Sequence, residues 1–200
     1  MVVREDLYNN NLIAWFEGES EIGPRALGHR SLLANPIYKD NWERMNLLKI
    51  REKWRPFAPA VLREDLEEWF QINCDSPYML LVSEIKKDKQ IAMSEKNKNL
   101  FGIDKLNIKR SIIPAVTHVD YSARIQTVHK ETNPRYYDLI NQFYKLTKCP
   151  ILVNTSFNVR GEPIVNTPED AFNCFMGTDL DKLVIGNCYL DKNNQNINLK

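Results

Sequence analysis

The apolar residues of this sequence come in short runs separated by segments rich in glycine, proline and charge, and this pattern most constrains the fold. The run Leu12–Phe16, for example, is followed by the polar segment Gly18–Arg30. A run of a few apolar residues has the length of a β-strand, and none approaches the roughly 20 residues that cross a bilayer. The chain is therefore expected to build a sheet from short strands.

Two segments carry helix signals instead. Pro134–Thr147 has apolar residues at helical spacing and a proline at the favoured first position, which predicts an amphipathic helix. Thr167 offers a capping hydroxyl before Pro168 and two acids, which predicts a helix to about Phe175 with Gly177 as its stop. Because strand and helix signals alternate, we predict one domain of mixed α/β (α+β) class, a mixed twisted sheet flanked by helices.

Weaker patterns complete the expected elements. We expect further strands over 31–34, 78–85, 115–119, 123–128, 151–154, 182–185 and 188–190, and helices over 39–49 and 63–70. Pro59 makes Phe57–Leu62 an edge strand or extended segment, because proline cannot donate to a ladder. The lysine-rich stretch 86–110 is expected to be an exposed hairpin or flexible loop, and 191–200 a flexible tail after a domain over 1–190.

Composition argues against several classes of function. The 200 residues carry a net charge of +1, which gives no electrostatic case for binding nucleic acid or a membrane surface. The N-terminus does not have the pattern of a signal peptide, so a cytoplasmic location is expected. The histidines are scattered, so no metal site is predicted. Buried free thiols are expected at the four cysteines, which form no C-x-x-C pair: Cys74, Cys149, Cys174 and Cys188.

Four polar segments have the composition of an anion-binding pocket: Gly23–Ser31, Lys49–Phe57, His118–Arg124 and Asn154–Pro163. Arginine offers a planar fork of donors that fits phosphate oxygens, and lysine adds a mobile point charge. Hydroxyl and amide side chains at a strand end add neutral donors that fix orientation. From the residues alone, the chain is therefore an α/β domain with a pocket for anions, and the reaction stays open.

Other common sites are not supported. Gly18 and Gly23 have the spacing of a phosphate-binding loop, but Pro24-Arg25 stands where that loop needs lysine and a hydroxyl residue. No G-x-G-x-x-G motif is present, which argues against a dinucleotide site. No Ser-His-Asp or Cys-His pattern stands out, so hydrolysis through a covalent intermediate has no support.

The same segments resemble the C-terminal region of the O-carbamoyltransferases of nodulation-factor and antibiotic biosynthesis. Four motifs carry the resemblance in the family's order: Gly23–Pro36, Lys49–Leu62, Thr117–Val128 and Ile151–Ala171. Together they span nearly the whole chain, about 12–190. In that family this region is similar in fold to YrdC, the threonylcarbamoyl-adenylate synthase. The Ser-x-Asn and Lys-x-Arg signatures of that enzyme resemble Ser156-x-Asn158 and Lys49-x-Arg51.

The resemblance implies a carbamoyl-activating domain. Such a domain binds ATP, with magnesium held mainly by phosphate oxygens and water, and carbamoyl phosphate. It forms carbamoyl-adenylate with release of pyrophosphate and phosphate. The carbamoyl group then passes to an acceptor hydroxyl on a separate N-terminal domain of the ASKHA type, which carries the metal-binding histidines. The sequence does not identify the acceptor.

The resemblance also implies roles for individual residues. Lys49 and Arg55 would hold carbamoyl phosphate, and Arg25 and Arg124 would contact phosphate groups or the carbamoyl end. These residues would act by positioning the substrates and stabilising charge, and no protein nucleophile would be needed. Asn154 and Ser156 would orient the nucleotide phosphates and the adenylate, and three further residues are secondary candidates for substrate binding: Arg51, Asn158 and Arg160.

Two departures from the family and two rival functions remain. Because the first motif follows so soon after Met1, we expect the N-terminal domain to be absent here, and His29 stands where the family commonly has asparagine. One rival function is a nucleotide-, anion- or partner-binding module without turnover. The other is an RNA-binding domain with a YrdC-like basic concavity, against which the low net charge counts. A homodimer would be one way to cover a face that otherwise meets the N-terminal domain.

Overall fold

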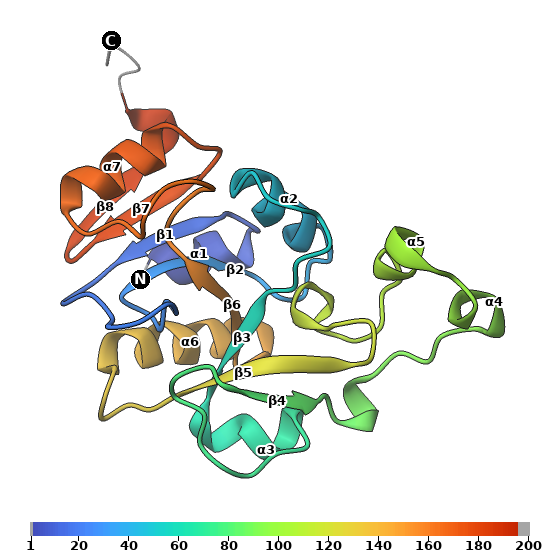
Figure 1. The fold of residues 1–200 in the computed structure, drawn as a ribbon. Helices are drawn as coiled ribbons and strands as arrows, with labels where there is room; N and C mark the ends of the chain where they lie inside the picture. Colours follow the sequence, from blue (N-terminus) through green and yellow to red (C-terminus); the bar gives the residue numbers. More distant parts are fainter. Residues whose placement is uncertain (1, 196–200) are drawn as a thin grey trace.

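A computed structural model describes residues 2–195, and its centre is one twisted sheet of eight strands in the order β4-β5-β3-β6-β2-β1-β7-β8 (Figure 1). The sheet is mixed: β1–β7 and β3–β5 are parallel pairs, and the other neighbours are antiparallel. The predicted fold class is confirmed. The strands are β1 Ile13–Phe16, β2 Arg30–Ala34, β3 Ala58–Leu62, β4 Leu81–Glu84, β5 Ser122–Val128, β6 Ile151–Ser156, β7 Lys182–Ile185 and β8 Cys188–Asp191.

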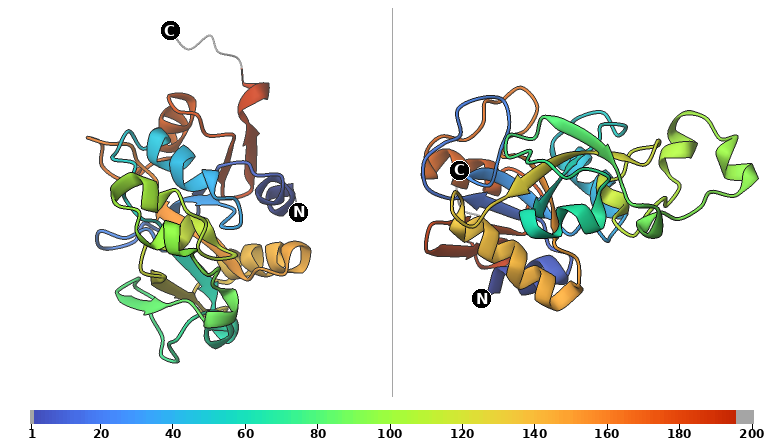
Figure 2. Two further views of the ribbon diagram at one scale, coloured as in Figure 1. Left: turned by 90° about the vertical axis from the view of Figure 1, so that its right-hand side faces the viewer. Right: turned by 90° about the horizontal axis from the view of Figure 1, so that it is seen from below.

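Helices cover both faces of the sheet (Figure 2). Helix α6 packs with α1 on one face and buries Tyr136, Leu139, Ile140 and Phe143. Helices α2 and α7 lie on the other face, and α7 packs against β1 and β7. The described helices are α1 Val2–Tyr8, α2 Asp40–Leu48, α3 Leu66–Trp69, α4 Glu95–Lys98, α5 Gly102–Leu106, α6 Pro134–Thr147 and α7 Pro168–Met176.

The two predicted helix starts are confirmed in detail. Asn133 caps α6 by accepting a hydrogen bond from the Tyr136 backbone, and Pro134 takes the first helical position. Thr167 and Asp170 form a reciprocal capping box at the start of α7, and Gly177 ends that helix. Helix α1, by contrast, was not predicted.

The strand directions bring four segment ends to one end of the sheet. Strand β6 runs antiparallel to β2 and β3, and β5 runs parallel to β3. The last residue of β6, Ser156, therefore lies at the same end as the first residues of β2, β3 and β5, which are Arg30, Ala58 and Ser122. All four polar segments of the sequence converge at this end.

The prediction of an edge strand at Phe57–Leu62 was wrong, because β3 lies between β5 and β6. Its proline is tolerated for a geometric reason. Leu62 donates its backbone N–H to Pro150 of the β6 side at 3.2 Å, so the alternate position Pro59 has its nitrogen turned away from β6. Pairing with β5 begins only at Ala60, and Pro59 thus interrupts neither ladder.

Three other expectations need correction. The expected strand 115–119 is a 3-10 turn over Pro114–Val116 followed by irregular chain. The stretch 86–110 contains α4 and α5, which stand out from the body as an arm (Figure 2), although Arg110 at its end is buried. Of the expected flexible tail, Asp191 ends β8 and a 3-10 turn follows over Lys192–Asn194, whereas 196–200 lie outside the described residues.

The four cysteines are free thiols, as predicted, but only Cys149 and Cys174 are buried. Cys74 and Cys188 are exposed, so that part of the expectation was wrong. Over residues 2–195, no helix combines the length and apolar character that a membrane span requires.

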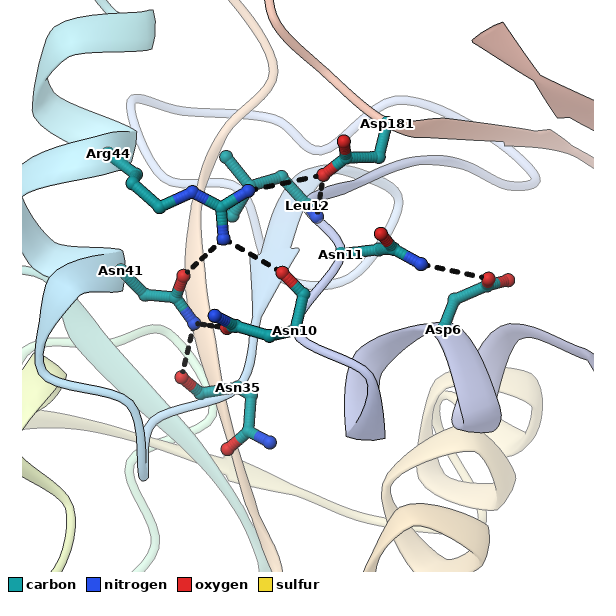
Figure 3. A network of polar contacts seen from close by, with 8 residues as sticks. All are labelled: Asp6, Asn10, Asn11, Leu12, Asn35, Asn41, Arg44 and Asp181. Carbon is teal, nitrogen blue, oxygen red and sulfur yellow. Dashed lines mark hydrogen bonds and ion pairs between the residues drawn. The ribbon is translucent and has the colours of Figure 1, made fainter. Parts of the chain in front are cut away.

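A polar network closes the end of the sheet opposite the four polar segments (Figure 3). Arg44 of α2 donates to the Asn10 carbonyl at 2.8 Å and to Asn41 Oδ1 at 3.0 Å, and lies 3.4 Å from Asp181. Asn41, which is fully buried, donates in turn to Asn10 Oδ1 and the Asn35 carbonyl. This network ties α2 to the turn between α1 and β1.

Candidate functional site

An open cavity of about 510 Å³ lies at the end of the sheet where the polar segments meet. Four arginines line this arginine pocket: Arg25 from the loop before β2, Arg51 and Arg55 from the segment between α2 and β3, and Arg124 from β5. Residues far apart in the sequence thus place four positive charges around one cavity. Its other lining residues include His118 and several apolar side chains.

The arginines of the pocket are poorly satisfied by the protein itself. Arg25 Nε, Arg51 Nη2 and Arg124 Nε are buried and have no hydrogen-bond partner within residues 2–195. Arg124 Nη2 donates a long hydrogen bond to the Met79 sulfur at 3.7 Å. Buried donors without acceptors are costly, and bound anions would supply the missing acceptors.

The pKa values of two pocket arginines also indicate positive charge that the protein does not fully neutralise. Burial, followed by the charge of Arg55, lowers the pKa of Arg51 to about 10. Burial and the charge of Arg25 lower the pKa of Arg124. The Glu52 carboxylate, which does not line the pocket, contacts Arg55 at 2.8 Å, but both side chains are about half exposed. The pocket therefore concentrates positive charge that the described chain only partly neutralises.

The rest of the lining is apolar and partly aromatic. Trp54, Phe57, Val82 and Val116 line the cavity beside the arginines, and the Arg51 guanidinium lies 4.4 Å from the centre of the Phe57 ring. A cavity that combines cations with flat apolar walls suits a ligand with several negative charges and one planar group.

A strained turn connects the pocket to a second cluster. Helix α2 ends at Leu48, and Ile50 follows in the left-handed region with a φ of 50°. A β-branched residue rarely adopts that conformation, and strain of this kind gathers at functional sites. The turn lets Lys49 reach the end of β6 while Arg51 lines the pocket.

The Lys49 amine is held by neutral oxygens. Its Nζ lies 2.6 Å from the Ser156 carbonyl, 3.3 Å from Ser156 Oγ, 2.8 Å from the Asn158 carbonyl and 3.0 Å from Asn158 Oδ1. Ser156 Oγ also donates to Asn158 Oδ1 at 2.7 Å. Burial, with the neighbouring charge of Arg51, lowers the pKa of Lys49 to about 7. The amine could exchange an oxygen of this set for a ligand oxygen.

Asn154 lies deeper than the pocket lining. It is buried in the centre of the sheet and donates to the Ala26 carbonyl at 2.9 Å and to Gln126 Oε1 at 2.7 Å. Its own Oδ1 has no partner among the described residues. Arg160 is exposed outside the pocket lining, although its backbone N–H donates to the Lys49 carbonyl at 3.1 Å.

The structure thus places seven of the nine predicted residues in two clusters and leaves two residues outside them. Arg25, Arg51, Arg55 and Arg124 lie together in the arginine pocket, and Lys49, Ser156 and Asn158 form the neighbouring cluster. Asn154 lies beneath the loop that carries Arg25, and Arg160 lies apart.

Sequence reasoning missed two residues that shape the site. Gln126 bridges Asn154 and the Leu27 carbonyl, to which its Nε2 donates at 2.8 Å. Glu21 accepts backbone hydrogen bonds from Leu27 at 2.7 Å and His29 at 2.8 Å. The available signals were a glutamine two residues after Arg124 on the same strand face and an acid two residues before the motif that starts at Gly23.

The loop before β2 also depends on a glycine. Gly28 has a φ of 106°, and a Cβ atom there would lie 2.3 Å from the Tyr136 ring. The loop therefore presses its backbone against α6, and only glycine fits.

Among the described residues, no group of three histidine, cysteine or acidic side chains could hold a metal ion.

Fold and site together define an α/β domain with a pocket built for anionic ligands. The sequence matches the model of the carbamoyltransferase C-terminus family over residues 4–192, and the chain belongs to this family. The predicted family is confirmed.

Curated relatives agree with this membership. An uncharacterized protein of Synechocystis is 54% identical over 94% of this chain and 31% of its own length. The nodulation protein NolO of Bradyrhizobium diazoefficiens is 43% identical over 89% of this chain and 30% of its own length. The 3'-hydroxymethylcephem-O-carbamoyltransferase of Amycolatopsis lactamdurans is 33% identical, over 93% and 32% respectively. The chain spans about a third of the length of these relatives.

A solved structure shares the fold. The match to full-length HypF in its phosphate- and nucleotide-bound form covers 93% of this protein and 24% of the HypF chain. The TM-score is 0.57 and the sequence identity is 16%. At this identity the likeness concerns the fold alone.

Proposed function

We propose that this chain is the carbamoyl-activating domain of an O-carbamoyltransferase, which forms carbamoyl-adenylate from ATP and carbamoyl phosphate. The observation that carries the proposal is the convergence of Arg25, Arg51 and Arg124, each with a buried N–H that lacks an acceptor in the described chain. Both proposed substrates are polyanions, and ATP adds the planar base that the aromatic wall would suit. Membership of the carbamoyltransferase family supports the same reaction class.

The reaction balances with one water molecule. Water converts carbamoyl phosphate to carbamate and phosphate, and a carbamate oxygen then attacks the α-phosphorus of ATP. The bond between the α-phosphorus and the bridging oxygen breaks, and pyrophosphate leaves. No protein nucleophile is needed, so the protein contributes position and charge stabilisation.

The proposal gives each residue a task. Arg25, Arg51, Arg55 and Arg124 would neutralise the phosphates and the charge that develops on the leaving pyrophosphate. Lys49 would give up part of its contact with Ser156 or Asn158 to bind a substrate oxygen. Magnesium would arrive with ATP, held by phosphate oxygens and water. Acceptor transfer would then need a region like the remaining two thirds of the relatives, supplied by the same or another chain.

Pyrophosphate release from ATP, measured with and without carbamoyl phosphate, tests the proposal. We expect release that depends on carbamoyl phosphate and falls at least about tenfold in Lys49→Ala and Ser156→Ala. Lys53→Ala and Ser83→Ala are matched controls, because Lys53 pairs with Glu43 on the surface and Ser83 lies outside both clusters. ATP binding without any release, even with the N-terminal domain supplied, would favour a binding module instead.

A further inference from the structure

We propose that Gln126 is a positioning residue that sets Arg25 into the arginine pocket through the backbone of Ala26 and Leu27. The inference rests on the proposed function, because it assumes that Arg25 binds a ligand phosphate. Gln126 itself is 3% exposed and does not line the pocket.

The loop that carries Arg25 has no regular secondary structure between β1 and β2. Its position must therefore come from contacts outside the ladders. The Ala26 carbonyl accepts from Asn154 Nδ2 at 2.9 Å, and the Leu27 carbonyl accepts from Gln126 Nε2 at 2.8 Å. The Leu27 carbonyl also accepts a longer hydrogen bond from Asn133 Nδ2 at 3.4 Å, so Gln126 is its closer donor. These two carbonyls directly follow Arg25, so whatever holds them also fixes the direction in which the arginine leaves the backbone.

Gln126 acts on both carbonyls. Its Nε2 binds Leu27 directly, and its Oε1 accepts from Asn154 Nδ2 at 2.7 Å, which orients the amide that binds Ala26. A side chain here must accept at one end and donate at the other. Glutamine does both, glutamate can only accept when ionised, and leucine can do neither.

The same strand supplies a second pocket group. Arg124 and Gln126 are two residues apart on β5 and therefore share one face of the sheet. Arg124 reaches the pocket, and its lowered pKa reflects burial and the nearby charge of Arg25. Strand β5 thus contributes one pocket arginine and holds the loop of another. Without Gln126, repulsion between the two guanidinium groups would favour an outward shift of Arg25, opposed by the remaining contacts of Leu27 with Glu21 and Asn133.

Gln126→Leu is the direct test, with two readouts. The first is tryptic cleavage of the Arg25–Ala26 bond, which the held and buried Ala26 should protect. We expect roughly tenfold faster cleavage there in Gln126→Leu, because local opening becomes easier. Cleavage after Lys98 in the exposed arm is the internal control and should not change. Gln71→Leu, at an exposed glutamine, is the matched variant.

The second readout is affinity for pyrophosphate by calorimetry. We expect Gln126→Leu to weaken binding about fivefold in the wild-type background and to have no further effect on Arg25→Gln, since the two residues act as a unit. Gln126→Glu keeps the acceptor for Asn154 and loses the donor to Leu27, and it provides a second variant if Gln126→Leu does not fold. We expect the same direction in both readouts.

The outcomes separate the two proposals. Unchanged cleavage at Arg25 in both variants would overturn the positioning role of Gln126, whatever the activity. Faster cleavage would also overturn it if Gln126→Leu weakened pyrophosphate binding equally in the wild-type and Arg25→Gln backgrounds. Gln126 would then affect binding by a path that does not involve Arg25. Wild-type protein that binds no pyrophosphate would overturn the ligand role of Arg25 and the proposed function together.

Discussion

The two ends of the sheet use arginine in opposite ways. At one end Arg44 binds the Asn10 carbonyl, Asn41 and Asp181, so its charge is matched inside the protein (Figure 3). At the other end Arg124 has a single weak contact to a sulfur and a buried Nε without a partner in the described residues. The comparison teaches that a satisfied arginine stabilises the fold, whereas an unsatisfied one is available to a ligand.

The largest expected effect concerns the backbone that supports the pocket. Gly28→Ala should lower the free energy of unfolding by more than about 3 kcal/mol, because the new Cβ meets Tyr136 at 2.3 Å and the φ of 106° disfavours alanine. Gly18→Ala is the control: it shares a positive φ but meets open space, and should cost about 1 kcal/mol. Urea denaturation measures both, and equal losses would mean that the loop does not press on α6.

The next test exchanges the two arginines. Arg124→Gln should weaken pyrophosphate binding by about a hundredfold, roughly 2.7 kcal/mol, and leave the free energy of unfolding unchanged or raised. Arg44→Gln should lower the free energy of unfolding by about 2 kcal/mol and leave pyrophosphate affinity unchanged, because charged hydrogen bonds to the fold are lost. If the two variants lost stability equally, the distinction between the ends would fail.

A pH experiment sharpens the comparison at Lys49. Its folded pKa of about 7 lies below the ordinary value of 10.5, so the unfolded chain binds more protons between these values. The stability that Lys49 contributes relative to Lys49→Met should therefore be present at high pH and be lost as the pH falls toward 7. Between about pH 9 and pH 7 we expect a change of about 2 kcal/mol in that difference.

Denaturation of both proteins at the two pH values measures this change. Lys49→Met loses the hydrogen bonds to Ser156 and Asn158 at both pH values. This pH-independent loss cancels when the stability difference between the two proteins is compared at the two pH values. A difference that stays constant with pH would mean that the four oxygens around the amine keep it charged throughout.

The smallest effect concerns the rim of the pocket. Glu52→Gln removes the carboxylate 2.8 Å from Arg55 and should strengthen pyrophosphate binding about twofold, because exposed ion pairs contribute little. Glu43→Gln is the matched control, since Glu43 pairs with Lys53 away from the pocket. Weaker binding in Glu52→Gln would show that the carboxylate orders Arg55 rather than competing with the ligand.

The sequence predicted the parts of this molecule that depend on local chemistry. The first-position proline Pro134 and the capping hydroxyl of Thr167 lie directly at the starts of their helices, so both helices could be predicted from local sequence. Charge density in the polar segments predicted an anion pocket, and the resemblance of their motifs to the carbamoyltransferase family implied the four individual arginines. Contacts between residues far apart in the sequence could not be predicted. Strand β3, for example, is interior only because β5 pairs with it from Ala60 on. Likewise, the role of Gln126 depends on its contact with Leu27, which is 99 residues away.

Heavy oxygen placed in the carbamoyl carbonyl of carbamoyl phosphate tests the central claim most directly. The protein, supplied with an N-terminal transferase domain if the chain alone is silent, is incubated with ATP and the labelled substrate, and the AMP is analysed by mass spectrometry. If carbamate attacks the α-phosphorus, labelled oxygen must appear in the phosphate of AMP. Unlabelled AMP, or ADP in its place, from a protein that binds both substrates would contradict carbamoyl-adenylate formation.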